Sequence, residues 1–69
     1  MKFEFTGETK IEFNITFKRI RAIETFGLVV KGELGGWLQA ESNLSHDGNA
    51  WVYGDAWVSG NARVSGDAR

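Results

Sequence analysis

The sequence predicts an all-β protein, in which an N-terminal cap rich in β-hairpins precedes a minimal hexapeptide-repeat β-helix of about one coil. Apolar and polar residues alternate over residues 2–18, and a six-residue repeat fills residues 48–69. No segment keeps a helical period over three turns. A chain of 69 residues forms one domain at most. We therefore divide a single integrated domain into a cap, residues 1–45, and a repeat segment, residues 46–69.

The first eighteen residues predict a hairpin. A strand over residues 2–5 alternates phenylalanine with charged residues, Thr6–Thr9 carries a turn signal, and a second strand covers residues 11–18. The alternation slips after Phe17. A one-residue slip of this kind predicts a β-bulge or a strand break near Arg19.

The middle of the chain predicts short elements. Residues 28–30 are expected to form a short strand, and a short helix or turn is expected within residues 39–43. The glycine-rich stretch 32–36 superficially suggests a phosphate-binding loop. It lacks the Lys-Ser/Thr ending and the following helix of such loops, so we expect a turn there.

Each repeat unit contains Gly, then Asn or Asp, then Ala, a variable residue and Val. Because the period is even, Gly, Ala and Val share one face of an extended chain, and the larger or polar residues share the other. Glycine accepts positive φ angles and Asn or Asp bonds the local backbone, so this pair predicts a corner. A meander of small hairpins also fits these pairs. The small inward residues favour a β-helix.

The repeat resembles the left-handed parallel β-helix of hexapeptide-repeat proteins. The inward aliphatic position of that family is matched by Val52, Val58 and Val64, and its small position by Ala56, Ala62 and Ala68. The residue after each valine departs from the usual small or acidic choice. The family's three hexapeptides per coil imply one coil over residues 48–65, with Gly66–Arg69 lying on Gly48–Trp51.

The whole chain also resembles short uncharacterised phage and prophage proteins that carry tandem repeats of this kind. The matching motifs are Gly35-Gly36-Trp37 and Asn43-Leu44-Ser45. This resemblance implies a phage-type origin. One coil cannot bury its own core, since solenoids gain stability by stacking neighbours. We therefore expect a homo-oligomer formed through the open end of the repeat.

Large side chains on the outward face of the repeat give the first candidate surface, for partner binding or self-association. An exposed aromatic patch usually marks an interaction site. Packing of these aromatics on the N-terminal hairpin remains the alternative. A cation–π contact is expected between the last residue of the chain and Trp51. The candidate residues are Trp51, Tyr53, Trp57, Arg63 and Arg69.

The basic cluster Lys18, Arg19 and Arg21 gives the second candidate surface, for a phosphate or nucleotide. A solvated strand face paired with Glu24 or Glu33 is the alternative.

We expect no catalytic residue, metal site or cofactor. The chain has no cysteine, and its single histidine, His46, precedes Asp47 at the entrance to the repeat. Hexapeptide-repeat acyltransferases use a histidine base, but general-base work needs a group that orients the imidazole and a pocket for substrate. We therefore interpret His46 as a capping or turn residue. The formal net charge of −1 gives no bulk attraction to nucleic acid.

The function expected from these features is that of a non-enzymatic, phage-type, oligomeric binding protein. Its expected partner is a host macromolecule, such as a protein of a bacterial defence system that it inhibits. The alternatives are a structural solenoid or virion-associated module, a sponge for a signalling nucleotide at a subunit interface, and an acyltransferase remnant. For the remnant we expect no binding of acetyl-CoA, and nucleic acid is a further alternative partner. With no signal peptide or long apolar run, we expect the cytoplasm, the host's if a phage encodes the chain, and no membrane partner.

Overall fold

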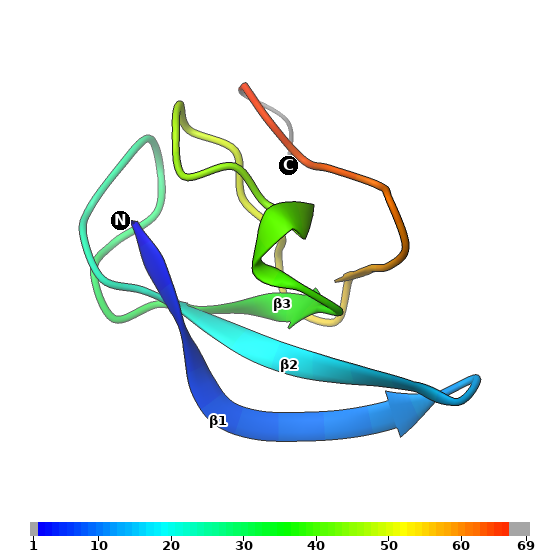
Figure 1. The fold of residues 1–69 in the computed structure, drawn as a ribbon. Coiled ribbons are helices and arrows are strands. Elements are labelled where there is room, and N and C mark those ends of the chain that lie inside the picture. The colour runs from blue at the N-terminus through cyan, green and yellow to red at the C-terminus, as the bar shows by residue number, and fades with distance from the viewer. Residues whose placement is uncertain (1, 67–69) are drawn as a thin grey trace.

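The fold, described for residues 2–66 by a computed structural model, is all-β, which confirms the predicted class. Four strands form one sheet in the order β1-β2-β3-β4 (Figure 1). The first two pairings are antiparallel and β3 pairs with β4 in parallel. The elements are β1 (Phe3–Glu12), β2 (Ile15–Ala22), β3 (Leu34–Leu38), the 3-10 helix η1 (Glu41–Asn43) and β4 (Trp57–Val58).

The hairpin is longer than predicted, because β1 runs through the expected turn at Thr6–Thr9. The pairing register shifts between Phe5 and Thr9. Gly7 adopts a φ of 95° in this stretch, so the extra residues form a bulge. The chain reverses instead at Phe13 and Asn14, with φ values of 51° and 62°. Two positive φ angles define the two-residue type I′ hairpin turn.

Strand β2 runs unbroken through Arg19, so the bulge or break predicted within this strand is wrong, and the irregularities lie in its two neighbours. The bulge of β1 lies opposite Arg19, and the pairing of β2 with β3 shifts again between Arg19 and Arg21. Phe17 and Ile20 are both buried although they are three positions apart, an odd number, in one strand. They therefore lie on opposite faces of the sheet, and each face carries buried apolar residues.

The middle of the chain departs from two expectations. Residues 28–30 form a loop rather than a strand, closed by reciprocal backbone hydrogen bonds of 3.0 and 2.8 Å between Phe26 and Val29. Strand β3 begins inside the expected turn at 32–36, because the backbone and side chains of the repeat pack directly on Gly35 and Gly36. The expected short helix is confirmed as η1.

The core lies between the inner face of the sheet and the returning chain. It combines residues from β1, β2 and β3 with Val29 of the loop, Leu44 and the first repeat unit. Their burial joins the cap and the repeat physically through one apolar cluster. The buried members are Phe3, Ile20, Ala22, Val29, Leu38, Leu44, Ala50, Trp51 and Val52.

The repeat stacks in parallel on the chain that precedes it. Trp57 pairs with Trp37, Val58 with Leu38, and Val64 forms an isolated bridge with Leu44. The four corner glycines have φ between 53° and 72°, as the repeat predicts. Within residues 2–66, however, only Trp57–Val58 of the repeat is regular strand, so a minimal β-helix is not confirmed.

The sequence predicts that Gly66 lies on Gly48, and the structure has this contact. Residues 67–69 of the same prediction lie outside the described residues. The backbone N–H of Asn49 donates to the carbonyl of Gly66 at 2.9 Å. A Cβ added to Gly48 would lie 2.8 Å from that same carbonyl oxygen. Position 48 therefore requires glycine, because the corner at Gly66 packs directly on it.

Candidate functional site

The outer face of the sheet, opposite the core, carries a row of aromatic side chains. Phe17 of β2, Trp37 of β3 and Trp57 of β4 come from three neighbouring strands. The ring centroids of Phe17 and Trp57 lie 5.1 Å apart. Phe13 reaches back from the hairpin turn to within 5.6 Å of the Trp57 ring. These separations are typical of packed aromatic pairs.

Two cations lie over this row. Lys10 Nζ is 4.6 Å from the ring centroid of Trp37 and 5.3 Å from that of Trp57. The Arg19 guanidinium lies 5.5 Å from the Trp37 centroid. Register pairing of Lys10 with Phe17 places both on this side of the sheet. We call Lys10, Phe13, Phe17, Arg19, Trp37 and Trp57 the aromatic face.

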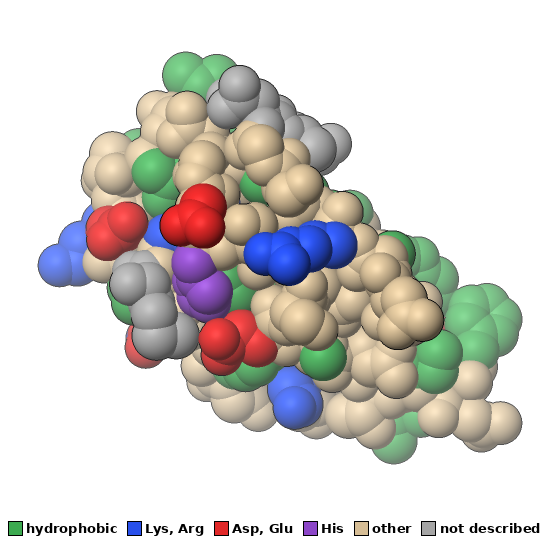
Figure 2. Space-filling view, turned by 45° about the horizontal axis from the view of Figure 1, so that its top comes forward, with side chains coloured by type: hydrophobic (Ala, Val, Ile, Leu, Met, Phe, Trp, Pro, Cys, Tyr) green, Lys and Arg blue, Asp and Glu red, His purple; other side chains and the backbone are tan. Residues whose placement is uncertain are grey.

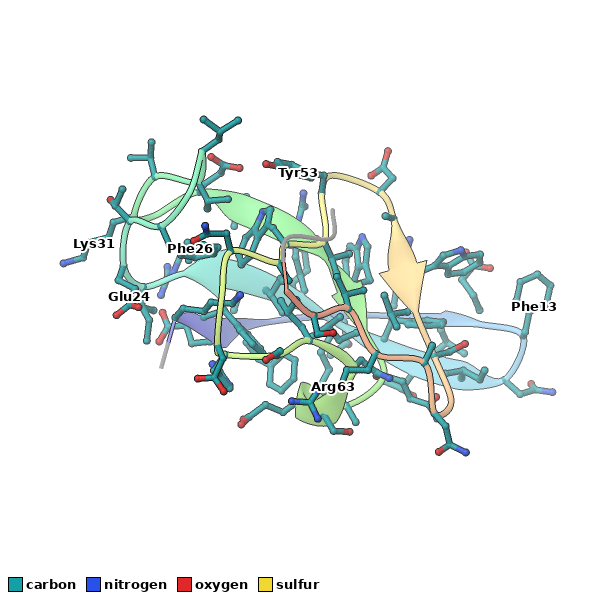
Figure 3. The ribbon with its side chains drawn as sticks, turned by 90° about the horizontal axis from the view of Figure 1, so that it is seen from above. Phe13, Glu24, Phe26, Lys31, Tyr53 and Arg63 are labelled. Atoms are coloured by element: carbon teal, nitrogen blue, oxygen red, sulfur yellow. The ribbon has the colours of Figure 1, made fainter. Side chains whose placement is uncertain are left out.

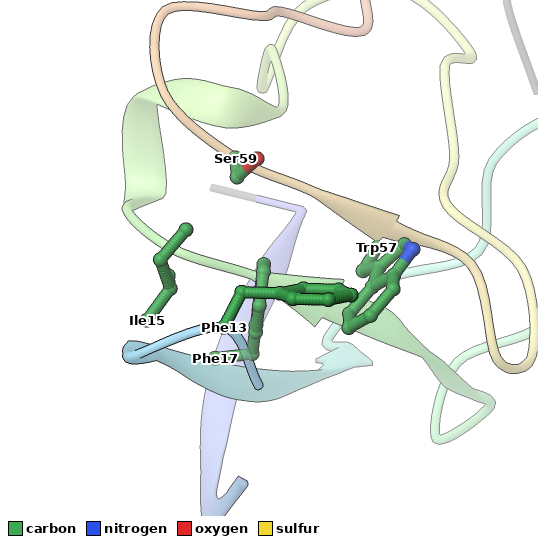
Figure 4. A pocket seen from close by; sticks show the side chains of 5 residues that line it. All are labelled: Phe13, Ile15, Phe17, Trp57 and Ser59. Carbon is green, nitrogen blue, oxygen red and sulfur yellow. The ribbon is translucent and has the colours of Figure 1, made fainter. Parts of the chain in front are cut away.

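A groove of about 250 Å³ opens beside the aromatic face, between the hairpin tip and β4 (Figure 4). Four of the five side chains that line it are apolar, and polar atoms also contribute to its surface. The lining residues are Phe13, Ile15, Phe17, Trp57 and Ser59.

The predicted outward patch of the repeat does not form one surface. Trp51 is 0% exposed, so the prediction that it points into solvent is wrong. The loop after β2 covers it, with Phe26 edge-on at 5.4 Å. Tyr53 and Arg63, both of the predicted patch, point in different directions (Figure 3). Arg69, with its expected contact to Trp51, lies outside the described residues.

Trp57 fits both sequence interpretations. It packs on two phenylalanines of the hairpin, yet 43% of it remains exposed. It is thus the residue of the predicted patch that enters the groove.

The basic cluster is divided between the two faces of β2. Arg21 donates to Glu4, and Arg19 lies 3.6 Å from Glu8. Lys18 lies on the opposite face, with its Nζ 5.2 Å from the Phe5 ring centroid. The expected partners Glu24 and Glu33 were wrong for both arginines, because β1 is the strand that pairs with β2 and supplies their carboxylates. A phosphate-binding role for the cluster stays a prediction.

His46 is held by both ring nitrogens. Nδ1 accepts from the backbone N–H of Lys2 at 3.3 Å, and Nε2 lies 3.2 Å from Glu41 Oε2. Since Nδ1 accepts, the ring hydrogen lies on Nε2 and is donated to the carboxylate. The ring also stacks on Phe3 at 4.2 Å, and acidic side chains flank it at the surface (Figure 2). The imidazole has no free lone pair for a general base in this arrangement.

Lys2 is a buried cation that the sequence analysis missed. Its ammonium donates to the carbonyls of Ala50 at 2.6 Å and Gly48 at 3.3 Å, and it lies 4.6 Å from the Phe26 ring centroid. Burial lowers the pKa of Lys2 below its ordinary value of 10.5, while Asp47 and Glu24 oppose the shift. The chain thus fixes its entry into the repeat through a cation bound by backbone carbonyls.

Alkaline pH is expected to relieve the cost of burying this cation. Between the lowered pKa of folded Lys2 and 10.5, the unfolded chain binds more protons than the folded chain. The free energy of unfolding therefore rises with pH across this window. Urea titrations at several pH values should show the rise in the natural chain and its loss in Lys2→Met. An equal slope in both chains would contradict this assignment.

Asn43 is the second functional residue that the sequence analysis did not single out as such. It is buried in η1, where its Oδ1 accepts from the backbone N–H of Ala40 at 2.8 Å. Its Nδ2 donates to the carbonyls of Ala62 at 2.8 Å and Gly60 at 3.2 Å. The side-chain amide of Asn43 therefore joins the turn at residues 40–43 to the repeat corner at residues 60–62. The only sequence signal was the Asn-Leu-Ser motif used for the resemblance.

Two further searches concern metals and membranes. Among residues 2–66, no group of three His, Cys, Asp or Glu side chains is placed to hold a metal ion. No helix in that part of the chain has the length and apolar character needed to span a bilayer.

Comparison with known proteins gives one informative similarity. No protein-family model matches the chain. The chain is 40% identical over 40 residues to the uncharacterised acetyltransferase YdcK of Escherichia coli strain K12. The match covers 58% of this chain and 12% of YdcK, so the chain spans about an eighth of that protein's length.

The similarity corrects one prediction and supports another in part. It supports the coarser prediction of a hexapeptide repeat and gives no support for a phage origin. The prediction that the protein is not an enzyme is contradicted, because this relative is named as an acetyltransferase.

Proposed function

We propose that this chain is the capped end of a hexapeptide-repeat acyltransferase assembly, completed by a second copy that docks on the open end of the repeat. The observation that carries the proposal is the parallel stacking of Val58 on Leu38 and Val64 on Leu44. This stacking builds a core that continues upward from the sheet. The relative's name supplies the reaction class, which is transfer of an acetyl group.

The upper edge of the repeat is suited to receive another strand. Trp37 N–H donates to the Ala56 carbonyl at 3.0 Å, and Gln39 N–H donates to the Val58 carbonyl at 3.1 Å. In a parallel ladder this pattern turns the backbone N–H and C=O of Trp57 away from β3, toward the free edge. A free edge of this kind recruits further strands.

The apolar interior is also uncovered at this end. Val58 and Val64 are only half-buried although both pack against the core, and Ala56 and Ala62 on the same face are exposed. A second copy would cover these side chains as the repeat covers Leu38 and Leu44. Because His46 is fully engaged within its own chain, the acyl-donor site of this proposal lies at the junction between copies.

Calorimetric titration with acetyl-CoA tests this function. We expect saturable binding by the natural chain and by Ser65→Lys, which adds a charge at an exposed position on the outward side. Ala62→Lys places the same charge on the inward side of the open end and is expected to abolish binding. Absence of heat with the natural chain at millimolar acetyl-CoA would refute the acyltransferase function.

A further inference from the structure

We propose that two copies of the chain meet head to head about a two-fold axis at Arg63, and that the paired Arg63 side chains bind a phosphate group. This inference rests on the proposed function, because it needs a second copy on the open end of the repeat. It adds the symmetry of the junction and the chemical class of its ligand, an anion that carries phosphate.

The two ends of the apolar core differ, and this difference selects the arrangement. At the end closed by the sheet, Phe3 and Ile20 are fully buried. At the open end, Val58 and Val64 are only half-buried. The uncovered end of one copy therefore finds an uncovered apolar surface only at the same end of another copy. Contact between two identical surfaces is isologous, so the assembly closes as a two-fold dimer.

The backbone at Arg63 is oriented to form this junction. The neighbouring Val64 uses both of its backbone groups on the segment below it. Its N–H donates to the Asn43 carbonyl at 2.9 Å, and its carbonyl accepts from the Ser45 N–H at 2.9 Å. In a parallel ladder the N–H and C=O of Arg63 then point to the opposite side, toward the free edge. In an antiparallel pair, Arg63 and the partner's Arg63 exchange both of these hydrogen bonds.

The inward side chains are complementary in this register. Pairing of Arg63 with the partner's Arg63 sets Val64 opposite the partner's Ala62, and Ala62 opposite the partner's Val64. Each half-buried valine therefore fills the space beside an exposed alanine. The apolar core thus continues across the junction without a collision between two large side chains.

An axis at Trp57 is the alternative, because the backbone groups of Trp57 also point to the free edge. Continued along the chain, that register would place the partner's Gly66 on Gly48. The backbone of Gly66 in the same chain already covers Gly48 and accepts a hydrogen bond from Asn49 at 2.9 Å. The axis at Arg63 avoids this overlap.

The two-fold axis brings two guanidinium groups together on the outward face. Residues that exchange both hydrogen bonds lie about 5.5 Å apart at their Cα atoms. Arg63 is exposed, and the ion pairs formed within residues 2–66 do not involve it. Like charges directly opposite each other are destabilising in a sheet. A phosphate group neutralises both charges and accepts hydrogen bonds from both planar guanidiniums.

Calorimetric titration of the full chain with inorganic pyrophosphate tests the site. We expect one ion to bind per two chains. Arg63→Gln should weaken this binding about a hundredfold, because one substitution removes both guanidiniums. Light scattering should still give a dimer for Arg63→Gln, since the change also removes the like-charge repulsion. Arg21→Gln is the matched control, because Arg21 is an exposed arginine bound to Glu4 on the sheet, and its binding should be unchanged.

The outcomes separate this inference from the proposed function. A trimer, a ratio of one ion per chain, or unchanged binding in Arg63→Gln would overturn the two-fold site, while saturable acetyl-CoA binding would still support the acyltransferase function. Pyrophosphate binding at one ion per two chains without any acetyl-CoA binding would support the two-fold site and refute that function. A natural chain that is monomeric and binds neither compound would refute both.

Discussion

Replacement of Gly36 by alanine is expected to unfold the stacked repeat. A Cβ at this position would lie 2.6 Å from Val52 Cγ1 and would collide with the backbone carbonyl of Ala56. That carbonyl accepts the hydrogen bond by which Trp37 pairs β3 with the repeat. Because a backbone atom cannot move aside as a side chain can, we expect a loss of about 3 kcal/mol or more. Urea denaturation followed by tryptophan fluorescence measures it.

Gly54→Ala is the matched control for this change. Gly54 has a φ of 53° and no atom within 4 Å of an added Cβ. The control therefore carries only the cost of a left-handed alanine, about 1 kcal/mol. If Gly36→Ala were no more destabilising than Gly54→Ala, the close contact between β3 and the repeat would be wrong.

Replacement of Asn43 by alanine is expected to detach residues 60–64 of the repeat from residues 43–45, on which they stack. The change removes three hydrogen bonds made by one buried amide, and it leaves the carbonyls of Gly60 and Ala62 without that donor. Each hydrogen bond contributes about 1 kcal/mol net to stability, so we expect the loss of three to cost roughly 3 kcal/mol. Domains of this size have marginal stability, and such a loss is a large fraction of it.

Hydrogen exchange gives the local readout for Asn43→Ala. The backbone N–H of Ser45 donates to Val64, and that of Val64 donates to Asn43. Amide protection should fall at Ser45 and Val64 before it falls in the hairpin. Asn61→Ala is the control, because Asn61 is an exposed asparagine of the repeat. Its effect should stay within about 0.5 kcal/mol. A uniform loss of protection in Asn43→Ala would show that Asn43 supports the whole fold rather than the junction.

Local rules predicted the parts of the fold that depend on neighbouring residues. The corner glycines followed from the Gly-Asn and Gly-Asp pairs, and each has the expected positive φ. The all-β class followed from alternation, but the bulges of β1 and β3 opposite β2 did not. The position of the hairpin turn did not follow from alternation, because the turn signal at Thr6–Thr9 competes with an uncommon turn at Phe13. Only the pairing register of β1 and β2 decides between them.

The candidate site was less accessible to sequence analysis because contacts distant in the chain create it. Trp51 lies on the outward side of its unit, but the loop at Phe26 covers it. Alternation cannot anticipate a cover supplied by another segment. The aromatic face is likewise set by register, which aligns Lys10 with Phe17 and Trp37 with Trp57. Lys2 appeared as an ordinary strand residue, and its burial depends on carbonyls more than forty residues away.

Solution mass is the most direct test of the central claim, that the open end of the repeat is completed by a second copy. Light scattering across a concentration series should give a dimer or trimer of constant mass for the natural chain and for Ser65→Lys. Ala62→Lys should be a folded monomer, because its charge lies on the surface that the second copy covers. A natural chain that is monomeric at every concentration, with cooperative unfolding, would contradict the account, because the uncovered valines would then need no partner.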